Sequence, residues 1–153
     1  MSVRTPEPVV ELGERIAVLP WHEATDVLDA HDPRSTYAER FWVGIIGPTA
    51  MWLLRRFADG FDTWPDGFEI PVRDLAGSLG IGGAGKHSPL ARTIARCSQF
   101  GLLRIEGECL YARRNLPPLS DRQVARLPLD LRTAHAALPV RRRRDGKVSA
   151  LRS

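Results

Sequence analysis

The stretch IPVRDLAGSLGIGGAGKHSPLARTIARCSQF, residues 70–100, contains two short helical patterns joined by a glycine-rich turn. In the first pattern, apolar residues recur at the i, i+3, i+4 and i+7 spacing of one helix face: Val72, Leu75, Ala76 and Leu79. Gly80 follows, and glycine is common just past a helix end. We therefore predict a helix that begins near Val72 and ends at Gly80.

The second pattern begins with Ser88 and Pro89. A serine oxygen can accept a hydrogen bond from a free amide at the helix start, and proline is well tolerated at the first helical position. The residues that follow form a stripe that we expect to be buried: Leu90, Ile94 and Cys97. At about 100° per residue, the opposite face carries Arg92, Arg96 and Gln99, with Thr93 on its flank. We predict a helix over Ser88–Phe100 whose arginine face suits a negatively charged groove.

The net charge of +4 conceals an asymmetry along the chain. Residues 1–69 carry 6 basic and 12 acidic side chains, a net charge of −6, whereas residues 70–153 carry 16 and 6, a net charge of +10. Such a split is expected where one face of a protein meets a polyanion. A chain that is simply rich in arginine would show the same number of basic side chains. Only the positions of the arginines can therefore indicate a binding face.

The turn Gly80–Lys86 nearly matches the phosphate-binding loop G-x-x-x-x-G-K-[ST]. In that loop, the hydroxyl directly after the lysine ligates magnesium, and a buried strand comes before the loop. Here His87 takes the place of the hydroxyl residue, and the preceding pattern is helical. We therefore predict a flexible turn whose glycines reach unusual backbone angles, and no nucleotide site.

Two helices are predicted before this stretch. Thr36 and Glu39 stand at a capping-box spacing and open a helix that ends at Gly47. Pro48 then begins a second helix that reaches about Asp59, since proline fits a first helical turn. Further upstream, residues 16–19 form either a strand or an extended segment, and a short helix begins near residue 21.

A β-hairpin is predicted after Gly101. Residues 102–105 and 109–113 alternate apolar and polar side chains around the loop Glu106-Gly107-Glu108. Two small helices follow, over residues 120–126 and 128–138. The tail RRRRDGKVSALRS is predicted to be disordered, and either adds salt-dependent affinity for a nucleic-acid backbone or keeps the chain soluble.

Helix, turn, helix and hairpin, after the helix 48–59, is the order of a winged helix-turn-helix. The predicted fold class is mainly α with a small β-hairpin, a winged helix-turn-helix core with N-terminal and C-terminal helical extensions. The predicted domains are an N-terminal arm and short helix (1–34), the winged domain (35–119), a C-terminal helical extension (120–140) and a basic disordered tail (141–153).

The segments VRDLAGSLGI and GLLRIEGECLYARR, with the helix between them, resemble the winged helix-turn-helix DNA-binding superfamily over about residues 48–114. Residues 21–138 more closely resemble a group of uncharacterised actinobacterial proteins of this architecture, through DPRSTYAERFWVGIIGPTAMWLLRRFADGF, LGIGGAGKHSPLARTIARCSQFGL and LPPLSDRQVARLP. The resemblance implies an intracellular winged-helix domain and no established reaction. The turn Gly80–Lys86 is longer than the turn of the simplest helix-turn-helix.

The function predicted from these patterns is binding of duplex DNA, with the helix Ser88–Phe100 in the major groove. A transcriptional regulator and a nucleoid or mobile-element accessory factor both fit. The candidate contacts lie on this helix, on the turn before it and on the hairpin: Lys86, His87, Ser88, Arg92, Thr93, Arg96, Gln99, Arg104, Arg113 and Arg114.

The alternative hypothesis is a protein-interaction scaffold that does not bind DNA. Its surface would be the aromatic helical stretch Tyr37–Trp52, which could meet a second copy of the chain or another protein. A continuous positive face joining Lys86, Arg92, Arg96 and Arg114 would favour DNA. Scattered arginines beside an exposed apolar patch would favour a protein partner.

No catalytic, metal or cofactor site is predicted, and we do not expect an enzyme. The histidines are far apart in the sequence, and neither Cys97 nor Cys109 has a partner at a ligand spacing. These cysteines suit reduced core thiols, although a disulfide stays open. The chain has no run of about 18 apolar residues and no secretory h-region, so we expect a cytoplasmic protein.

Overall fold

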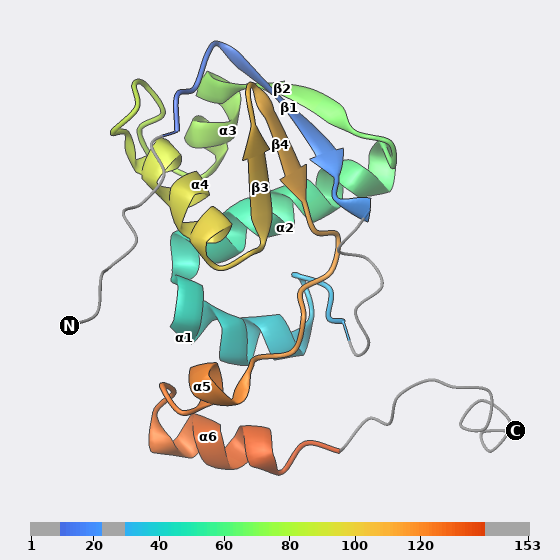
Figure 1. The fold of residues 1–153 in the computed structure, drawn as a ribbon, viewed down its shortest axis with the longest axis vertical. Coiled ribbons are helices and arrows are strands. Elements are labelled where there is room, and N and C mark those ends of the chain that lie inside the picture. The colour runs from blue at the N-terminus through green and yellow to red at the C-terminus, as the bar shows by residue number, and fades with distance from the viewer. Residues whose placement is uncertain (1–9, 23–29, 140–153) are drawn as a thin grey trace, which may run out of the picture.

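The computed structural model describes residues 10–22 and 30–139. The strands in this part of the chain are β1 (Arg15–Pro20), β2 (Phe68–Pro71), β3 (Leu103–Glu106) and β4 (Cys109–Ala112). The helices are α1 (Val43–Ile46), α2 (Pro48–Thr63), α3 (Val72–Ser78), α4 (Pro89–Gln99), α5 (Asp121–Val124) and α6 (Leu129–Ala136), and a π-helical turn, Ala38–Trp42, runs into α1 (Figure 1).

The described strands form one sheet in the order β2-β1-β4-β3. β1 pairs antiparallel with β2 and parallel with β4, so that Ile16 lies opposite Ile70 and Val18 opposite Leu110. β3 and β4 form an antiparallel hairpin. β1 comes first in the chain but is a central strand, with hydrogen-bonded neighbours on both sides.

The predicted fold class, a mainly α protein with a winged helix-turn-helix core and a small β-hairpin, is wrong. The chain has an α/β fold, in which a four-stranded mixed sheet is interleaved with helices. The hairpin is present at residues 103–112, but it is one side of this sheet. The error has a physical cause: β2 has only four residues, too few for a periodic pattern, and its partner β1 lies far away in the sequence.

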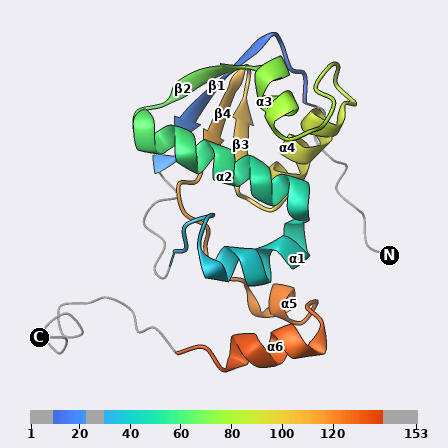
Figure 2. The ribbon, with the colours of Figure 1, turned by 180° about the vertical axis from the view of Figure 1, so that it is seen from behind.

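α2 crosses one face of the sheet, as Figures 1 and 2 show from opposite sides. Gly47 has a φ of 89° and separates α1 from α2, and Pro48 occupies the first turn of α2 as predicted. The helix continues beyond the expected end to Thr63. It contributes Met51, Leu54 and Phe57 to a core that also contains Ile16 and Val18 of β1, among others.

A second layer, made of the π-helical turn, α1, α5 and α6, lies beyond one end of the sheet (Figure 1). Tyr37 connects its parts: the hydroxyl accepts a hydrogen bond from the Leu119 amide at 2.9 Å and lies 2.8 Å from His135 Nε2. His31 stacks on the Tyr37 ring, with centroids 3.7 Å apart. The two C-terminal helices that the sequence predicted are therefore tied to the body of the protein.

Three sequence predictions fall wholly or largely outside the described residues: the start of the N-terminal arm (1–9), most of the short helix that begins near residue 21, and the basic tail 141–153. Within the described part of the chain, no helix has the length and hydropathy that crossing a membrane requires.

Removing the hydroxyl of Tyr37 tests its role as the connector of the second layer. In Tyr37→Phe, the Leu119 amide loses its acceptor, so we expect the free energy of unfolding to fall by about 1–3 kcal/mol. Urea denaturation would measure the change. Tyr111→Phe on β4 is the matched control, because it keeps the ring that Arg104 contacts. Equal destabilisation by the two variants would contradict the assignment.

Candidate functional site

α4 has the two faces that the sequence predicted. The Ser88 hydroxyl accepts a hydrogen bond from the Ala91 amide at 3.1 Å, and Pro89 stands in the first turn. The expected stripe is buried in the core: Leu90, Ile94 and Cys97. The opposite face is exposed and presents Arg92, Arg96 and Gln99. This amphipathic helix is confirmed, although it belongs to a different fold.

Two candidate contacts on α4 are engaged within the helix itself. Ser88 is buried, and its oxygen serves as the N-cap. The Thr93 hydroxyl donates to the Pro89 carbonyl at 2.7 Å. Lys86 and His87 are exposed in the preceding loop. The accessible polar groups of this region are therefore Lys86 and His87 together with the exposed side chains of α4.

The glycine-rich loop that precedes α4 is fixed at both ends. The Ile81 amide donates to the Ala76 carbonyl at 3.1 Å, and the Leu90 amide donates to the Gly82 carbonyl at 3.0 Å. Gly83 packs so closely on α3 that an added Cβ would lie 2.7 Å from the Ala76 Cβ. These contacts, rather than a tight turn, set the direction of α4. α3, rather than a strand, precedes the loop, which is unlike a phosphate-binding loop.

Arg96 is both a surface residue and a structural one. Its Nε donates to the Ile46 carbonyl at 2.8 Å, and its Nη2 donates to the Ile45 carbonyl at 3.1 Å. Its guanidinium also lies 5.5 Å from the centroid of the Phe100 ring. The last carbonyls of α1 therefore find donors on α4, and the side chain is held at the junction of the two helices.

The three arginines predicted on the hairpin each contact a group outside α4. Arg104 pairs with Glu106 at 3.0 Å and lies over Tyr111 of the neighbouring strand. Arg113 donates to the Gly101 carbonyl at 2.8 Å, and its burial lowers its pKa. Arg114 lies over the Phe61 ring and 4.0 Å from an Asp62 oxygen. Each of these three arginines is therefore engaged by a carboxylate, a carbonyl or an aromatic ring of the described residues.

Carboxylates neutralise some of the arginines and not others. Arg34 hydrogen-bonds to Asp32, Asp59 and Asp62, and these bonds hold the pKa of Asp32 and Asp62 below the ordinary value. Arg55 pairs with Glu39. In the described ranges, by contrast, no carboxylate lies within ion-pair distance of Arg56, Arg92 or Arg96. No Asp or Glu occurs in the sequence between Asp74 and Glu106, so α4 and its loop keep their positive charge.

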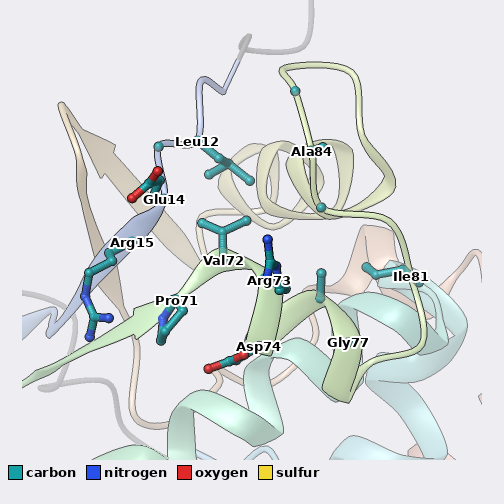
Figure 3. A pocket seen from close by; sticks show the side chains of 14 residues that line it. Leu12, Glu14, Arg15, Pro71, Val72, Arg73, Asp74, Gly77, Ile81 and Ala84 are labelled. Carbon is teal, nitrogen blue, oxygen red and sulfur yellow. The ribbon is translucent and has the colours of Figure 1, made fainter.

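A groove of about 1020 Å³ lies between the start of β1, α3 and the glycine-rich loop (Figure 3). Leu12, Val72 and Ile81 are among its apolar walls. Its charged lining is balanced, with Glu14 and Asp74 against Arg15 and Arg73, and the groove therefore does not favour a polyanion.

The described residues contain no group of three or more His, Cys, Asp or Glu side chains placed to hold a metal ion. Both cysteines are free thiols, as the sequence indicated. Burial raises the pKa of Cys97 to about 12, so this thiol stays protonated and is a poor nucleophile at neutral pH.

The aromatic surface of the alternative hypothesis is mostly buried. Phe41 and Trp42 are each only 1% exposed, and Tyr37 is half-buried within the second layer. Trp52 is the exception, with 49% exposure. Sequence reasoning placed Trp52 in the predicted surface but missed its partnership with Arg56, whose i+4 spacing on one helix face was the available signal.

Comparison of the chain with protein-family models, with curated proteins and with solved structures finds no match. The family resemblance drawn from the sequence gains no support from these comparisons. Any functional assignment therefore rests on the geometry of α4 and its surroundings.

Adding a methyl group to Gly83 tests how the loop directs α4. Gly83→Ala brings a Cβ into the Ala76 side chain, and we expect a loss of about 1–3 kcal/mol in the free energy of unfolding. Gly82→Ala is the matched control, since its Cβ would meet Pro89 at an ordinary distance of 3.5 Å. Thermal and urea unfolding would measure both. A loop that tolerates the two changes equally would contradict the close packing on α3.

Replacing Arg34 tests the aspartate cluster through the pH dependence of stability. Because Arg34 lowers the folded-state pKa of Asp32 and Asp62, the stabilisation is present above the unfolded pKa, about 3.9, and is lost as the pH falls through the folded values. We expect Arg34→Gln to reduce stability at neutral pH and to flatten its decline below about pH 4. Urea unfolding across this range would test it, with Arg132→Gln on α6 as the control. Parallel pH profiles for the wild type and Arg34→Gln would refute it.

Proposed function

We propose that the protein binds duplex DNA through the exposed face of α4. The observation that carries this proposal is the combination on one helix of exposed Arg92, Arg96 and Gln99 with a fully buried opposite stripe. A helix fits the major groove of B-DNA, and arginine and glutamine match the edges of guanine and adenine there. The lack of any carboxylate between Asp74 and Glu106 removes local repulsion of phosphates.

The exposed residues have different roles in this proposal. Arg92 and Gln99 read base edges, because α4 holds their backbone rigidly against the core. Arg96 uses two of its N–H groups on the α1 carbonyls, and its remaining donors serve a phosphate. Lys86 and His87, on the loop before α4, add contacts to the DNA backbone that carry no sequence preference.

The hairpin arginines Arg104, Arg113 and Arg114 have no part in this proposal, since each has a structural partner elsewhere. A cytoplasmic regulator of transcription or a nucleoid or mobile-element accessory factor would use such a surface.

Binding of duplex DNA by Arg92→Ala tests the proposal. A duplex would first be selected from a random pool with the wild-type protein, and affinities would then be measured by fluorescence anisotropy at about 50 and 200 mM salt. We expect Arg92→Ala to bind the selected duplex roughly five- to 150-fold more weakly, which corresponds to one lost bidentate contact of about 1–3 kcal/mol.

Arg132→Ala, an exposed arginine on α6, is the matched control and should bind as the wild type does. Failure of the wild-type protein to bind any duplex at the lower salt concentration would refute the proposal. So would equal affinities of Arg92→Ala and Arg132→Ala.

A further inference from the structure

Trp52 is an exposed aromatic side chain on α2 that two arginines flank. The guanidinium groups of Arg55 and Arg56 lie 4.9 and 5.5 Å from the centroid of its ring. The indole nevertheless keeps 49% of its surface exposed. A large aromatic surface left in water beside two cations is typical of binding surfaces.

The two arginines differ in charge balance. Arg55 forms an ion pair with Glu39 at 3.0 Å, so its charge is compensated. Arg56 donates from Nη2 to the Ser78 carbonyl at 3.3 Å, and no carboxylate in the described residues lies within ion-pair distance of it. Its Nε is buried without a hydrogen-bond partner. The surface around Trp52 therefore carries a net positive charge that comes from Arg56.

Trp52 and Arg56 line a hollow of about 260 Å³ between α2 and the C-terminal end of α3. The other lining residues are Pro48, Thr49, Ser78 and Leu79. The hollow thus combines an aromatic wall and a guanidinium with small polar side chains. Because Nε is buried and one N–H of Nη2 donates to Ser78, the donors of Arg56 left for a phosphate are those of Nη1 and the second N–H of Nη2.

The hollow and the exposed face of α4 belong to the same end of the molecule. Arg96 on α4 binds the carbonyls of Ile45 and Ile46, and the hollow begins two residues later at Pro48. Figures 1 and 2 both show α4 next to the junction between α1 and α2. The start of α2, which lines the hollow, therefore lies close to the part of α4 that carries Arg96.

We propose that the hollow at Trp52 and Arg56 holds the sugar–phosphate backbone of the DNA strand that flanks α4. Arg56 binds a phosphate through Nη1 and the N–H of Nη2 that does not donate to Ser78, and the exposed indole packs against the adjacent sugar. This inference rests on the proposed binding of DNA by α4, and it adds a contact that fixes the position of the duplex without reading its sequence.

The test measures the affinity of Trp52→Ala and Arg56→Gln for two duplexes, the selected sequence and a scrambled one. A backbone contact weakens both by the same factor, so we expect a several-fold loss on each duplex. We also expect Arg56→Gln to reduce the slope of log affinity against log salt by about one. Arg56→Lys keeps the charge and should restore the slope.

Trp64→Ala and Arg132→Gln are the matched controls. Trp64 is also exposed but follows the opposite end of α2, and Arg132 lies on α6. Both should bind like the wild type, and circular dichroism and thermal unfolding would establish that every variant is folded.

The two proposals fail in different ways. If the wild type binds DNA and Trp52→Ala and Arg56→Gln bind as tightly as the controls, the contact at the hollow is refuted and the role of α4 stands. A loss confined to the selected duplex would also refute a backbone contact. If the wild type binds neither duplex at low salt, both proposals are refuted.

Discussion

The pairing of β1 with β2 on one side and β4 on the other is the constraint on which the rest of the structure depends. Without β1, the hairpin β3–β4 would stand alone and β2 would have no neighbour, and an isolated hairpin is only marginally stable in water. α3 begins directly after β2, and the Val72 amide donates to the Glu14 carbonyl just before β1. α3 then supports the glycine-rich loop through Ala76, and the loop directs α4. The orientation of the exposed arginines therefore traces back to a strand at the start of the described chain.

Local signals made α4 predictable, and the absence of local signals concealed the sheet. Ser88 and Pro89 start the helix through contacts within four residues, and the stripe from Leu90 to Cys97 repeats at the helical period. The pairing of Ala17 with Glu69 depends on residues far apart in the sequence, and no pattern in either strand identifies the other. The same limit applied to the candidate site, because the partners of Arg96 and Arg113 are backbone carbonyls that any sequence would supply. Trp42 and Trp52 belong to one aromatic stretch, and only the packing of the layers decides which is buried.

Carboxylates pair with several arginines, so the charge asymmetry of the sequence is weaker on the surface of the folded protein. Arg34 and Arg55 lie in the acidic half and are compensated there. Arg104 and Arg114 lie in the basic half but also have carboxylates nearby, at Glu106 and Asp62. In the described residues, the arginines without a nearby carboxylate are thus fewer than the net charge of the basic half suggests. Arg96 of α4 lies at the end of α1, and Arg56 of α2 lies at the end of α3.

Arg96 is an exposed side chain that also holds two elements of the fold together. A free arginine on a helix samples many rotamers, and immobilising it costs about 2 kcal/mol of conformational entropy. The bonds from Arg96 to the Ile45 and Ile46 carbonyls fix the side chain when the protein folds. The entropy of ordering this guanidinium is therefore lost during folding. A molecule that later meets it encounters a preorganised donor.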